Sequence, residues 1–228
     1  MNYFEKTALL IPVFNEEGNI RKVIEQCLNY FQNIIVIDDG SFDNTYTELE
    51  KFDSIIYLKH CINCGQGTAI ATGIKYFFHE TNFDYLITFD GDGQHFIEDA
   101  IEMLRYANDY SYDVIFGSRF LKKEFQIFVP KKRKLLLRFA KFFEKIFYNI
   151  NLSDAHNGLR ILNRKACKKL INLESAAMAH STEIALKVKL SKLRYTEYPC
   201  RVFYDQVIKD SQSPLNSLNI ISDLIQRK

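Results

Sequence analysis

The stretch DYLITFDGDGQH (residues 84–95) decides the fold class of this chain. It begins as a short apolar run and ends in a polar turn that contains two carboxylates. Apolar runs of this length without alternation are typical of strands that are buried on both faces. Similar runs, each bounded by turn residues, are TALLIPVF (7–14), NIIVID (33–38), SIIYLKH (54–60) and YDVIFGS (112–118).

Amphipathic helical patterns lie between these runs, at residues 17–31, 67–79 and 96–107. Strands that alternate with helices predict an α/β fold with a mostly parallel, Rossmann-like sheet, covered by helices on both sides. In such sheets, ligands bind beyond the carboxyl ends of the strands. The chemistry of this protein is therefore expected at the turns that follow the apolar runs.

The pattern changes after residue 120, where we expect a smaller second half packed on the first within one domain, 1–228. The expected elements are a long amphipathic helix (132–150), helices near 164–172, 178–190 and 214–226, a pair of strands near 193–204, and a polar lid loop at 205–214.

Composition excludes several classes of protein. The 228 residues are 47% hydrophobic and 25% charged, and the net charge of +2 is too small to predict nucleic-acid binding. The five cysteines are odd in number and scattered, which favours a reduced cytoplasm over a disulfide framework. The N-terminus lacks the features of a signal peptide, and no uncharged apolar stretch reaches the roughly 20 residues that span a bilayer.

Acidic clusters follow three of the predicted strands, and they are expected to converge on one cleft. They are Asn15-Glu16-Glu17, Asp38-Asp39-Gly40-Ser41 and Asp90-Gly91-Asp92. Two carboxylates that flank a glycine can face one divalent ion, and Gln94 adds an oxygen ligand. A solvated turn is the alternative, but the position directly after a strand favours a site for Mg²⁺ or Mn²⁺ at Asp90, Asp92 and Gln94.

The order and spacing of eight motifs resemble the inverting glycosyltransferases of family 2, which have the GT-A fold. The similarity is greatest to the dolichol-phosphate-mannose-synthase-like branch and its bacterial relatives. The motifs are IPVFNEEGNI (11–20), VIDDGSFDNT (36–45), NCGQGTAIATG (63–73), FDGDGQH (89–95), FGSRF (116–120), DAHNGLRILNRKA (154–166), AHSTEI (179–184) and YTEYPCRVFY (195–204).

The resemblance implies a nucleotide-sugar-binding first half, 1–120. Pro12, Phe14 and Glu16 would lie at the nucleoside, and Asp39 would accept a hydrogen bond from the base, whereas Asp38 is structural. Gly65 and Gly67 would let the chain pass close to the nucleotide. Asp90, Asp92 and Gln94 would hold the metal against the diphosphate, where departure of the leaving group builds negative charge.

The resemblance also implies an acceptor-side second half, 121–228. Arg119 would neutralise phosphate, since an arginine can grip two phosphate oxygens at once. Glu183 would be the general base, or it only stabilises the start of a helix. A lipid phosphate acceptor needs no base, because its oxygen is already ionised. Further cations that could close over phosphates are Arg160, Arg201 and Lys209.

The basic amphipathic helix at 132–150 has three interpretations. It lies on an anionic membrane surface, it forms an interface between two copies of the chain, or it covers the protein's own core. The last two are favoured on general grounds, and the resemblance favours the first. We expect a cytoplasmic protein that associates loosely with the inner face of the membrane.

Two other functions compete with sugar transfer from a UDP- or GDP-sugar to a lipid-linked or saccharide acceptor. A sugar-nucleotidyltransferase is disfavoured because the first strand is followed by an acidic turn instead of a basic, glycine-rich one. A scaffold without catalytic activity is disfavoured because every expected metal ligand is present. The Cys61–Cys64 pair, a lone C-x-x-C, is rejected as a zinc site because it lacks a second pair of ligands.

Overall fold

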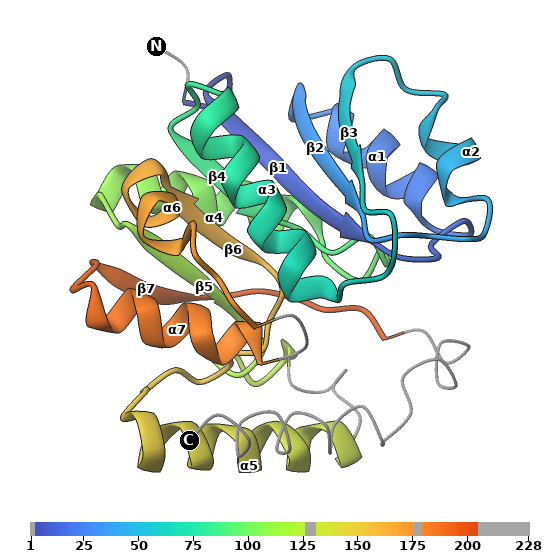
Figure 1. The fold of residues 1–228 in the computed structure, drawn as a ribbon. Helices are drawn as coiled ribbons and strands as arrows, with labels where there is room; N and C mark the ends of the chain where they lie inside the picture. The colour runs from blue at the N-terminus through green and yellow to red at the C-terminus, as the bar shows by residue number, and fades with distance from the viewer. Residues whose placement is uncertain (1–2, 126–130, 176–178, 205–228) are drawn as a thin grey trace.

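The structure is a computed structural model that describes residues 3–125, 131–175 and 179–204. One sheet of seven strands crosses this part of the chain in the order β3-β2-β1-β4-β6-β5-β7 (Figure 1). The strands are β1 (Thr7–Val13), β2 (Asn33–Asp38), β3 (Ile55–Lys59), β4 (Tyr85–Thr88), β5 (Val114–Ser118), β6 (Arg160–Asn163) and β7 (Tyr195–Pro199).

All strand pairs are parallel except those of β6, which is antiparallel to both β4 and β5. The prediction of a mostly parallel sheet is therefore confirmed. The helices are α1 (Ile20–Leu28), α2 (Thr45–Leu49), α3 (Gln66–Glu80), α4 (Ile97–Tyr110), α5 (Lys131–Tyr148), α6 (Arg164–Leu170) and α7 (His180–Leu190).

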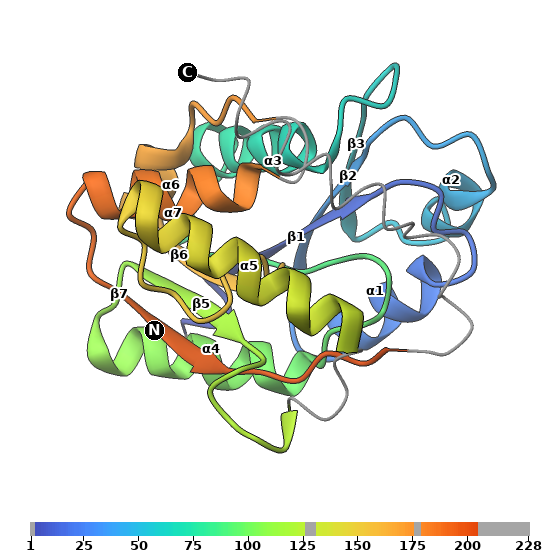
Figure 2. The same cartoon turned by 90° about the horizontal axis from the view of Figure 1, so that it is seen from below.

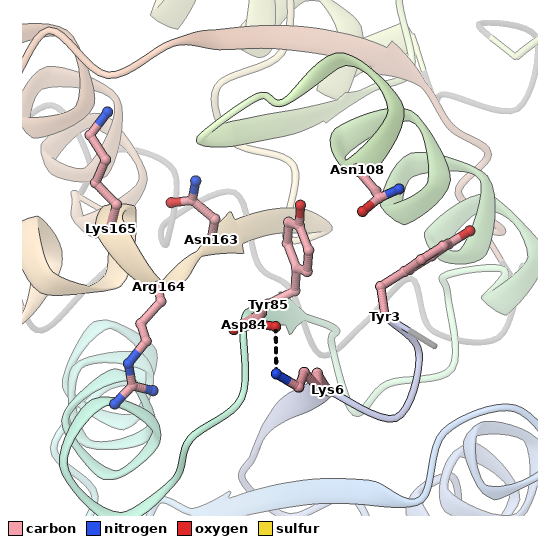
Figure 3. Close-up of a pocket in the computed structure, with 8 residues that line it drawn as sticks. All are labelled: Tyr3, Lys6, Asp84, Tyr85, Asn108, Asn163, Arg164 and Lys165. Carbon is pink, nitrogen blue, oxygen red and sulfur yellow. Dashed lines mark ion pairs between the residues drawn. The ribbon is translucent and has the colours of Figure 1, made fainter. Parts of the chain in front are cut away.

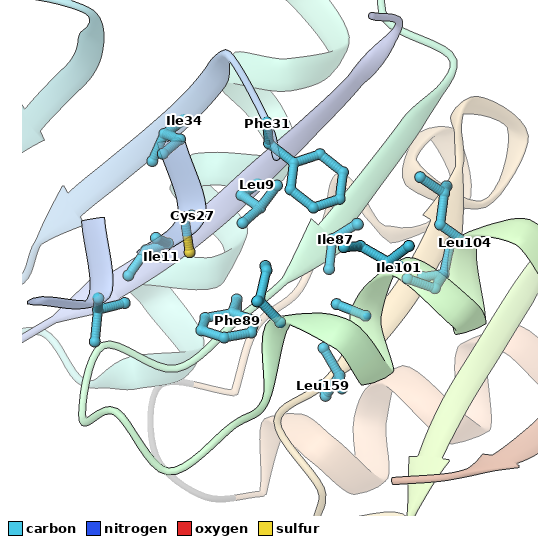
Figure 4. Packing of buried hydrophobic residues seen from close by; sticks show 14 of the residues in the cluster. Leu9, Ile11, Cys27, Phe31, Ile34, Ile87, Phe89, Ile101, Leu104 and Leu159 are labelled. Atoms are coloured by element: carbon cyan, nitrogen blue, oxygen red, sulfur yellow. The ribbon is translucent and has the colours of Figure 1, made fainter. Parts of the chain in front are cut away.

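Helices cover both faces of the sheet, as Figure 1 shows. Every residue of β1 is buried, and its side chains alternate between two hydrophobic clusters. Leu9 and Ile11 pack on the side of α1 and α4 (Figure 4), whereas Ala8 and Leu10 pack on the side of α3. Burial on both faces explains why the run at 7–14 is apolar without alternation.

The second half of the chain extends the same sheet, since β6 and β7 belong to it. Helix α5 lies apart from the sheet, below it in Figure 1, and crosses in front of it in Figure 2, which is seen from below. It is joined to α7 by the Lys189 ammonium, which donates to the carbonyls of Tyr148 (3.3 Å) and Asn149 (2.6 Å). In the part of the chain that the structure describes, no helix is long and apolar enough to cross a membrane.

Two details of the predicted second half are wrong. Strand β6 is absent from the sequence prediction because it has only four residues and begins with a charged one, Arg160. It is recognised as a strand only by its pairing with β4 and β5. The predicted strand pair near 193–204 is the single strand β7, followed by an isolated bridge from Val202 to His95. The second segment therefore pairs with the turn after β4 and not with the first segment. The expected loop 205–214 and helix 214–226 lie outside the described residues.

Candidate active site

The carboxylate of Asp90 is held in place just after β4. Its Oδ1 accepts from Gln66 Nε2 and its Oδ2 contacts His95 Nε2, both at 3.0 Å. Burial alone would raise the pKa of Asp90, but the hydrogen bond and charge of His95 and the charge of Arg160 hold this pKa below its ordinary value. The carboxylate is therefore ionised and oriented, as a metal ligand must be.

Gly158, in the turn before β6, lies directly against this carboxylate. A Cβ placed at residue 158 would be only 2.0 Å from Asp90 Oδ2. The carbonyl oxygen of Gly158 accepts from Thr88 Oγ1 at 2.6 Å, which fixes the turn to the end of β4. The second half of the chain thus shapes the space around Asp90.

Asp92 and Gln94 complete the turn. Asp92 Oδ1 accepts from the backbone N–H of Gln94 at 3.0 Å, and Gly93 between them has a positive φ of 74°. The turn borders a cavity of about 170 Å³ against α1, which is lined by Asn19, Lys22, Val23, Gln26, Asp92, Gly93, Gln94 and Phe203. Two carboxylates and an amide oxygen form a donor set that suits Mg²⁺ or Mn²⁺.

The turns after β1 and β2 carry the residues expected at the nucleoside. Pro12 is buried within β1, and the ring of Phe14 is 39% exposed. Phe14 meets the 83% exposed ring of Phe42 edge-on at 5.9 Å. Phe42 was not singled out in the sequence, where only its position in the DDGSF turn could have signalled it. Burial raises the pKa of Glu16, although a hydrogen bond from Asn19 opposes this shift.

The two adjacent aspartates have different tasks. Asp38 is fully buried and accepts from Ser41 N and Tyr57 Oη, both at 2.7 Å, which is a structural role. Asp39 Oδ2 accepts from Gly65 N at 2.7 Å, and its Oδ1 contacts the ring of His60. Asp39 therefore fixes the loop that leads into α3, a contact that the sequence did not predict.

The glycines of this loop lie at the start of α3. Gly65 is the residue before the helix and has a φ of 92°, which favours glycine. Gly67 lies in the first helical turn and is buried. The side chain of Gln66 between them donates to Asp90, so that this loop is joined to the turn after β4.

Arg119, which we expected to face phosphate, lies in a buried ion pair. Its side chain is 3% exposed, and its Nε and Nη2 each donate to Asp154 at 2.6 Å. Its Nη1 donates to the hydroxyl of Tyr204 at 2.5 Å. Burial alone would raise the pKa of Asp154, but the charge and hydrogen bonds of Arg119 hold it below its ordinary value. The guanidinium of Arg119 is therefore already paired with a carboxylate of the chain. Its role as a phosphate ligand stays a prediction.

Arg160 is a buried cation with unsatisfied donors in the described structure. It is fully buried, and its Nη2 donates to Ala155 O (3.2 Å) and Ser181 Oγ (2.9 Å). Its Nε and Nη1 have no hydrogen-bond partner among the described residues. Burial lowers its pKa to about 10, against the opposing charges of Asp90 and Asp154, so that it is charged at neutral pH. An anion beside it would satisfy these donors.

Of the other two expected cations, the structure describes Arg201 alone. Arg201 donates from its Nε and Nη2 to Asp99, and its guanidinium stacks 4.4 Å above the ring of Phe96. It anchors the segment after β7 to the start of α4. Lys209 lies outside the described residues.

Glu183 is occupied by the chain itself. In the first turn of α7, it accepts from Glu174 N (3.0 Å) and Ser175 N (2.7 Å) and pairs with Lys187 at 2.9 Å. Burial alone would raise the pKa of Glu183, but these hydrogen bonds lower it. A lowered pKa makes a weaker base, so the geometry favours the structural interpretation of Glu183 over the general base.

A second pocket, at the opposite end of the strands, is larger, with a volume of about 400 Å³ (Figure 3). Its cations are already engaged. Lys6 pairs with Asp84 at 3.5 Å, and Arg164 donates to the carbonyls of Phe78 and Phe83. It lies at the amino ends of the parallel strands β1 and β4, and we assign it no ligand.

Comparison with known proteins shows the fold and the family of this chain. The structure of glucosyl-3-phosphoglycerate synthase of Mycobacterium tuberculosis in complex with phosphoglyceric acid matches this chain with a TM-score of 0.70 and 14% identity. The match covers 97% of this chain and 79% of the synthase chain. In its complex with Mn²⁺, UDP and glucosyl-3-phosphoglycerate, the TM-score is 0.66. The fold is therefore that of the GT-A glycosyltransferases.

The family follows from the sequence match. The model of glycosyl transferase family 2 matches residues 8–171, and this chain belongs to that family. UDP-N-acetylglucosamine–dolichyl-phosphate N-acetylglucosaminyltransferase of Methanococcus voltae is 31% identical over 87% of this chain and 86% of its own. Polyprenol monophosphomannose synthase of Mycolicibacterium smegmatis is 24% identical over 73% of this chain and 64% of its own.

Proposed function

We propose that this glycosyltransferase moves a sugar, with inversion, from a UDP- or GDP-sugar to the phosphate of a lipid-linked acceptor. The observation that carries the proposal is the ionised, oriented Asp90 carboxylate in the Asp90–Gln94 turn at the end of β4. Support comes from the related fold that binds Mn²⁺ and UDP, and from relatives named for dolichyl-phosphate and polyprenol substrates.

The donor would occupy the edge formed by the turns after β1, β2 and β4. The exposed rings of Phe14 and Phe42 offer apolar surface for a nucleobase. Asp39, beside them at the end of β2, would accept the N–H of the base. Asp90, Asp92 and Gln94 would hold Mg²⁺ or Mn²⁺, and the bound ion would supply charge stabilisation for the departing nucleoside diphosphate.

The acceptor phosphate would lie beside Arg160. The Nε and Nη1 of Arg160 and both ring nitrogens of His156 are buried donors or acceptors without a hydrogen-bond partner in the described structure. His156 does lie 3.2 Å from the carboxylate of Glu144, but outside hydrogen-bond geometry. A phosphate oxygen is already ionised, so it attacks without a general base. This agrees with Glu183 being engaged by the backbone.

The exposed face of α5 would lie on the membrane that holds the lipid. Leu135, Phe142 and Ile146 are 71%, 61% and 57% exposed and recur at helical spacing. Among the described side chains of α5, the exposed charges are all positive, and the one acid, Glu144, is buried against Thr182. A basic helix with exposed apolar side chains binds anionic lipid surfaces.

The test is transfer from labelled UDP- and GDP-sugars to a polyprenyl phosphate in mixed micelles, with Mn²⁺, Mg²⁺ or a chelator. We expect a lipid-linked product of inverted anomeric configuration with one donor, which is lost with the chelator and in Asp92→Asn. Asp84→Asn is the matched control, because this exposed carboxylate precedes β4 at its other end and should leave the rate unchanged.

Three outcomes would contradict the proposal. Transfer to a free saccharide but not to the lipid would replace the acceptor. Synthesis of a nucleotide sugar from a nucleoside triphosphate and a sugar phosphate would indicate a nucleotidyltransferase. Absence of turnover and of nucleotide binding at millimolar concentration would favour a scaffold.

A further inference from the structure

Three side chains of different chemistry converge beside the nucleoside end of the site. Asp39 follows β2, His60 follows β3, and Cys64 lies in the loop before α3. One ligand atom from each lies within 4.8 Å of the other two. The closest pair, Asp39 Oδ1 and His60 Nδ1, is 2.7 Å apart. The carboxylate is almost fully buried and the imidazole is 15% exposed, so this pair is largely shielded from solvent.

The local backbone holds these side chains in place before any ligand arrives. The N–H groups of Cys64 and Gly65 donate to Asp39 at 2.9 and 2.7 Å. His60 donates from its backbone N–H to Asp38 O at 2.8 Å, and its Nε2 lies 3.0 Å from Thr72 Oγ1, which orients the ring.

Gly40 completes the support. A Cβ at this position would lie 2.5 Å from the backbone carbon of Ile62, and its φ is +79°. The loop 61–64 therefore rests directly on the end of β2, and it can do so only because residue 40 is a glycine. Cys64 is thus positioned by backbone packing as well as by its hydrogen bond to Asp39.

Thiolate, imidazole and carboxylate together are the ligand set of zinc, whereas the oxygen donors of the Asp90–Gln94 turn suit harder ions. The lone C-x-x-C was rejected as a zinc site because it lacked a second pair of ligands. The fold supplies that pair, Asp39 and His60. A water molecule can provide the fourth ligand, whereas Cys61, exposed and three residues before Cys64, lies outside the cluster and would have to move to do so.

We propose that Asp39, His60 and Cys64 bind Zn²⁺, and that bound zinc excludes the nucleotide from the site. Zinc would bind Nδ1 of the neutral His60 ring, whose one proton would then sit on Nε2 beside Thr72 Oγ1, and the thiol proton of Cys64 would pass to solvent. The exclusion rests on the proposed function, which gives Asp39 to the base of the donor. The metal site itself does not depend on it. Zinc would then be an inhibitor that acts apart from the Mn²⁺ site.

The first experiment is a titration of the whole, reduced protein with Co²⁺ as a spectroscopic substitute for Zn²⁺, with Mg²⁺ in excess to occupy the oxygen site. A thiolate-to-cobalt charge-transfer band should appear with one equivalent and disappear when Zn²⁺ is added. Cys64→Ser and His60→Asn should lose the band. Zinc affinity should fall by more than about tenfold, since losing even a partner of a ligand costs about 10–100-fold.

Cys61→Ser tells which group is the fourth ligand. The charge-transfer band should weaken in this variant if Cys61 is the fourth ligand, and it should be unchanged if the fourth ligand is a water molecule. Thermal melting of each variant verifies that it is folded. Absence of the band in the wild type, or zinc affinity in Cys64→Ser equal to that of the wild type, would overturn the metal site.

The second experiment measures UDP and GDP binding by calorimetry at fixed Mn²⁺, with and without Zn²⁺. Zinc should weaken nucleotide binding to the wild type and have no effect on Cys64→Ser. Equal weakening in both would place the effect of zinc at the Mn²⁺ site and refute the exclusion. If neither protein binds a nucleotide, the proposed function fails, while the cobalt band still decides the metal site.

Discussion

Replacing Gly158 by alanine should disable the metal turn with one methyl group. The new Cβ would lie 2.0 Å from Oδ2 of Asp90, 2.5 Å from its Cγ and 2.6 Å from its Oδ1. Real Cβ contacts are essentially never shorter than 3.0 Å, so the carboxylate must move by about 3.0 − 2.0 = 1.0 Å. The backbone of residue 158 cannot easily move instead, because Thr88 holds its carbonyl at 2.6 Å.

This displacement has a predictable size in catalysis. It would stretch the 3.0 Å contacts of Asp90 with Gln66 and His95 and would carry the carboxylate away from its metal position. A misplacement of about 1 Å in an active site costs about 100-fold in rate, which is about 2.7 kcal/mol in the transition-state free energy. The cost in folding stability should be about 1–3 kcal/mol, as for other overpacked sites.

The assay compares kcat/KM for sugar transfer and the Mn²⁺-dependent rise in Tm with nucleotide, in wild type and Gly158→Ala. Gly18→Ala is the matched control, because a Cβ at residue 18 would meet nothing within 4 Å. We expect Gly158→Ala to lose both signals and Gly18→Ala to keep both. If Gly158→Ala were folded and as active as the wild type, the assignment of Asp90 to the metal would be refuted.

Three further predictions concern the buried network and the packing of the sheet. Asp154→Asn leaves the Arg119 charge buried without its partner, so urea unfolding should give a free energy lower by about 3–5 kcal/mol; an unchanged midpoint would contradict the buried ion pair. Glu183→Gln should keep the transfer rate near that of the wild type, whereas loss of a general base costs about 100–10,000-fold. Because the pKa of Glu183 is lower in the folded state, its carboxylate stabilises the folded protein at pH values above the ordinary pKa of 4.5. This stabilisation is lost as the pH falls through the lowered pKa. The difference in unfolding free energy between wild type and Glu183→Gln should therefore vanish at acid pH. Gly73→Ala would place a Cβ 2.1 Å from Leu10 Cδ1 and should destabilise the protein by about 1–3 kcal/mol without changing nucleotide affinity, as unfolding and calorimetry would show.

The sequence predicted those parts of the fold whose signals are local. The runs at 7–14, 33–38 and 84–90 are apolar throughout because their strands are covered on both faces, and the helices between them carry one apolar face each. The Asp90–Gln94 turn was equally visible, since its residues are adjacent in the chain, and its metal stays a prediction. Strand β6 carried no such signal, because four residues that begin with a buried arginine become a strand only through pairing with β4 and β5.

The sequence predicted which residues belong to the candidate site. It did not predict the ion-pair and hydrogen-bond partners of those residues. Arg119 was predicted as a phosphate ligand, but it forms an ion pair with Asp154, which lies 35 residues away in the chain. Glu183 looked equally like a base and a helix-stabilising residue, and the backbone at 174–175 favours the second. Each of these outcomes depends on a contact between segments that no periodicity or spacing relates.

By itself, the sequence determined the fold class and the family, and it predicted the turn at which Mg²⁺ or Mn²⁺ would bind, because hydrophobic periodicity and short motifs are properties of neighbouring residues. Only the tertiary structure decided which charges are already paired and which are not. It left two donors of Arg160 unsatisfied and brought Asp39 and His60 to Cys64. The physical reason is that burial and ion pairing act through space, between residues that the chain places far apart.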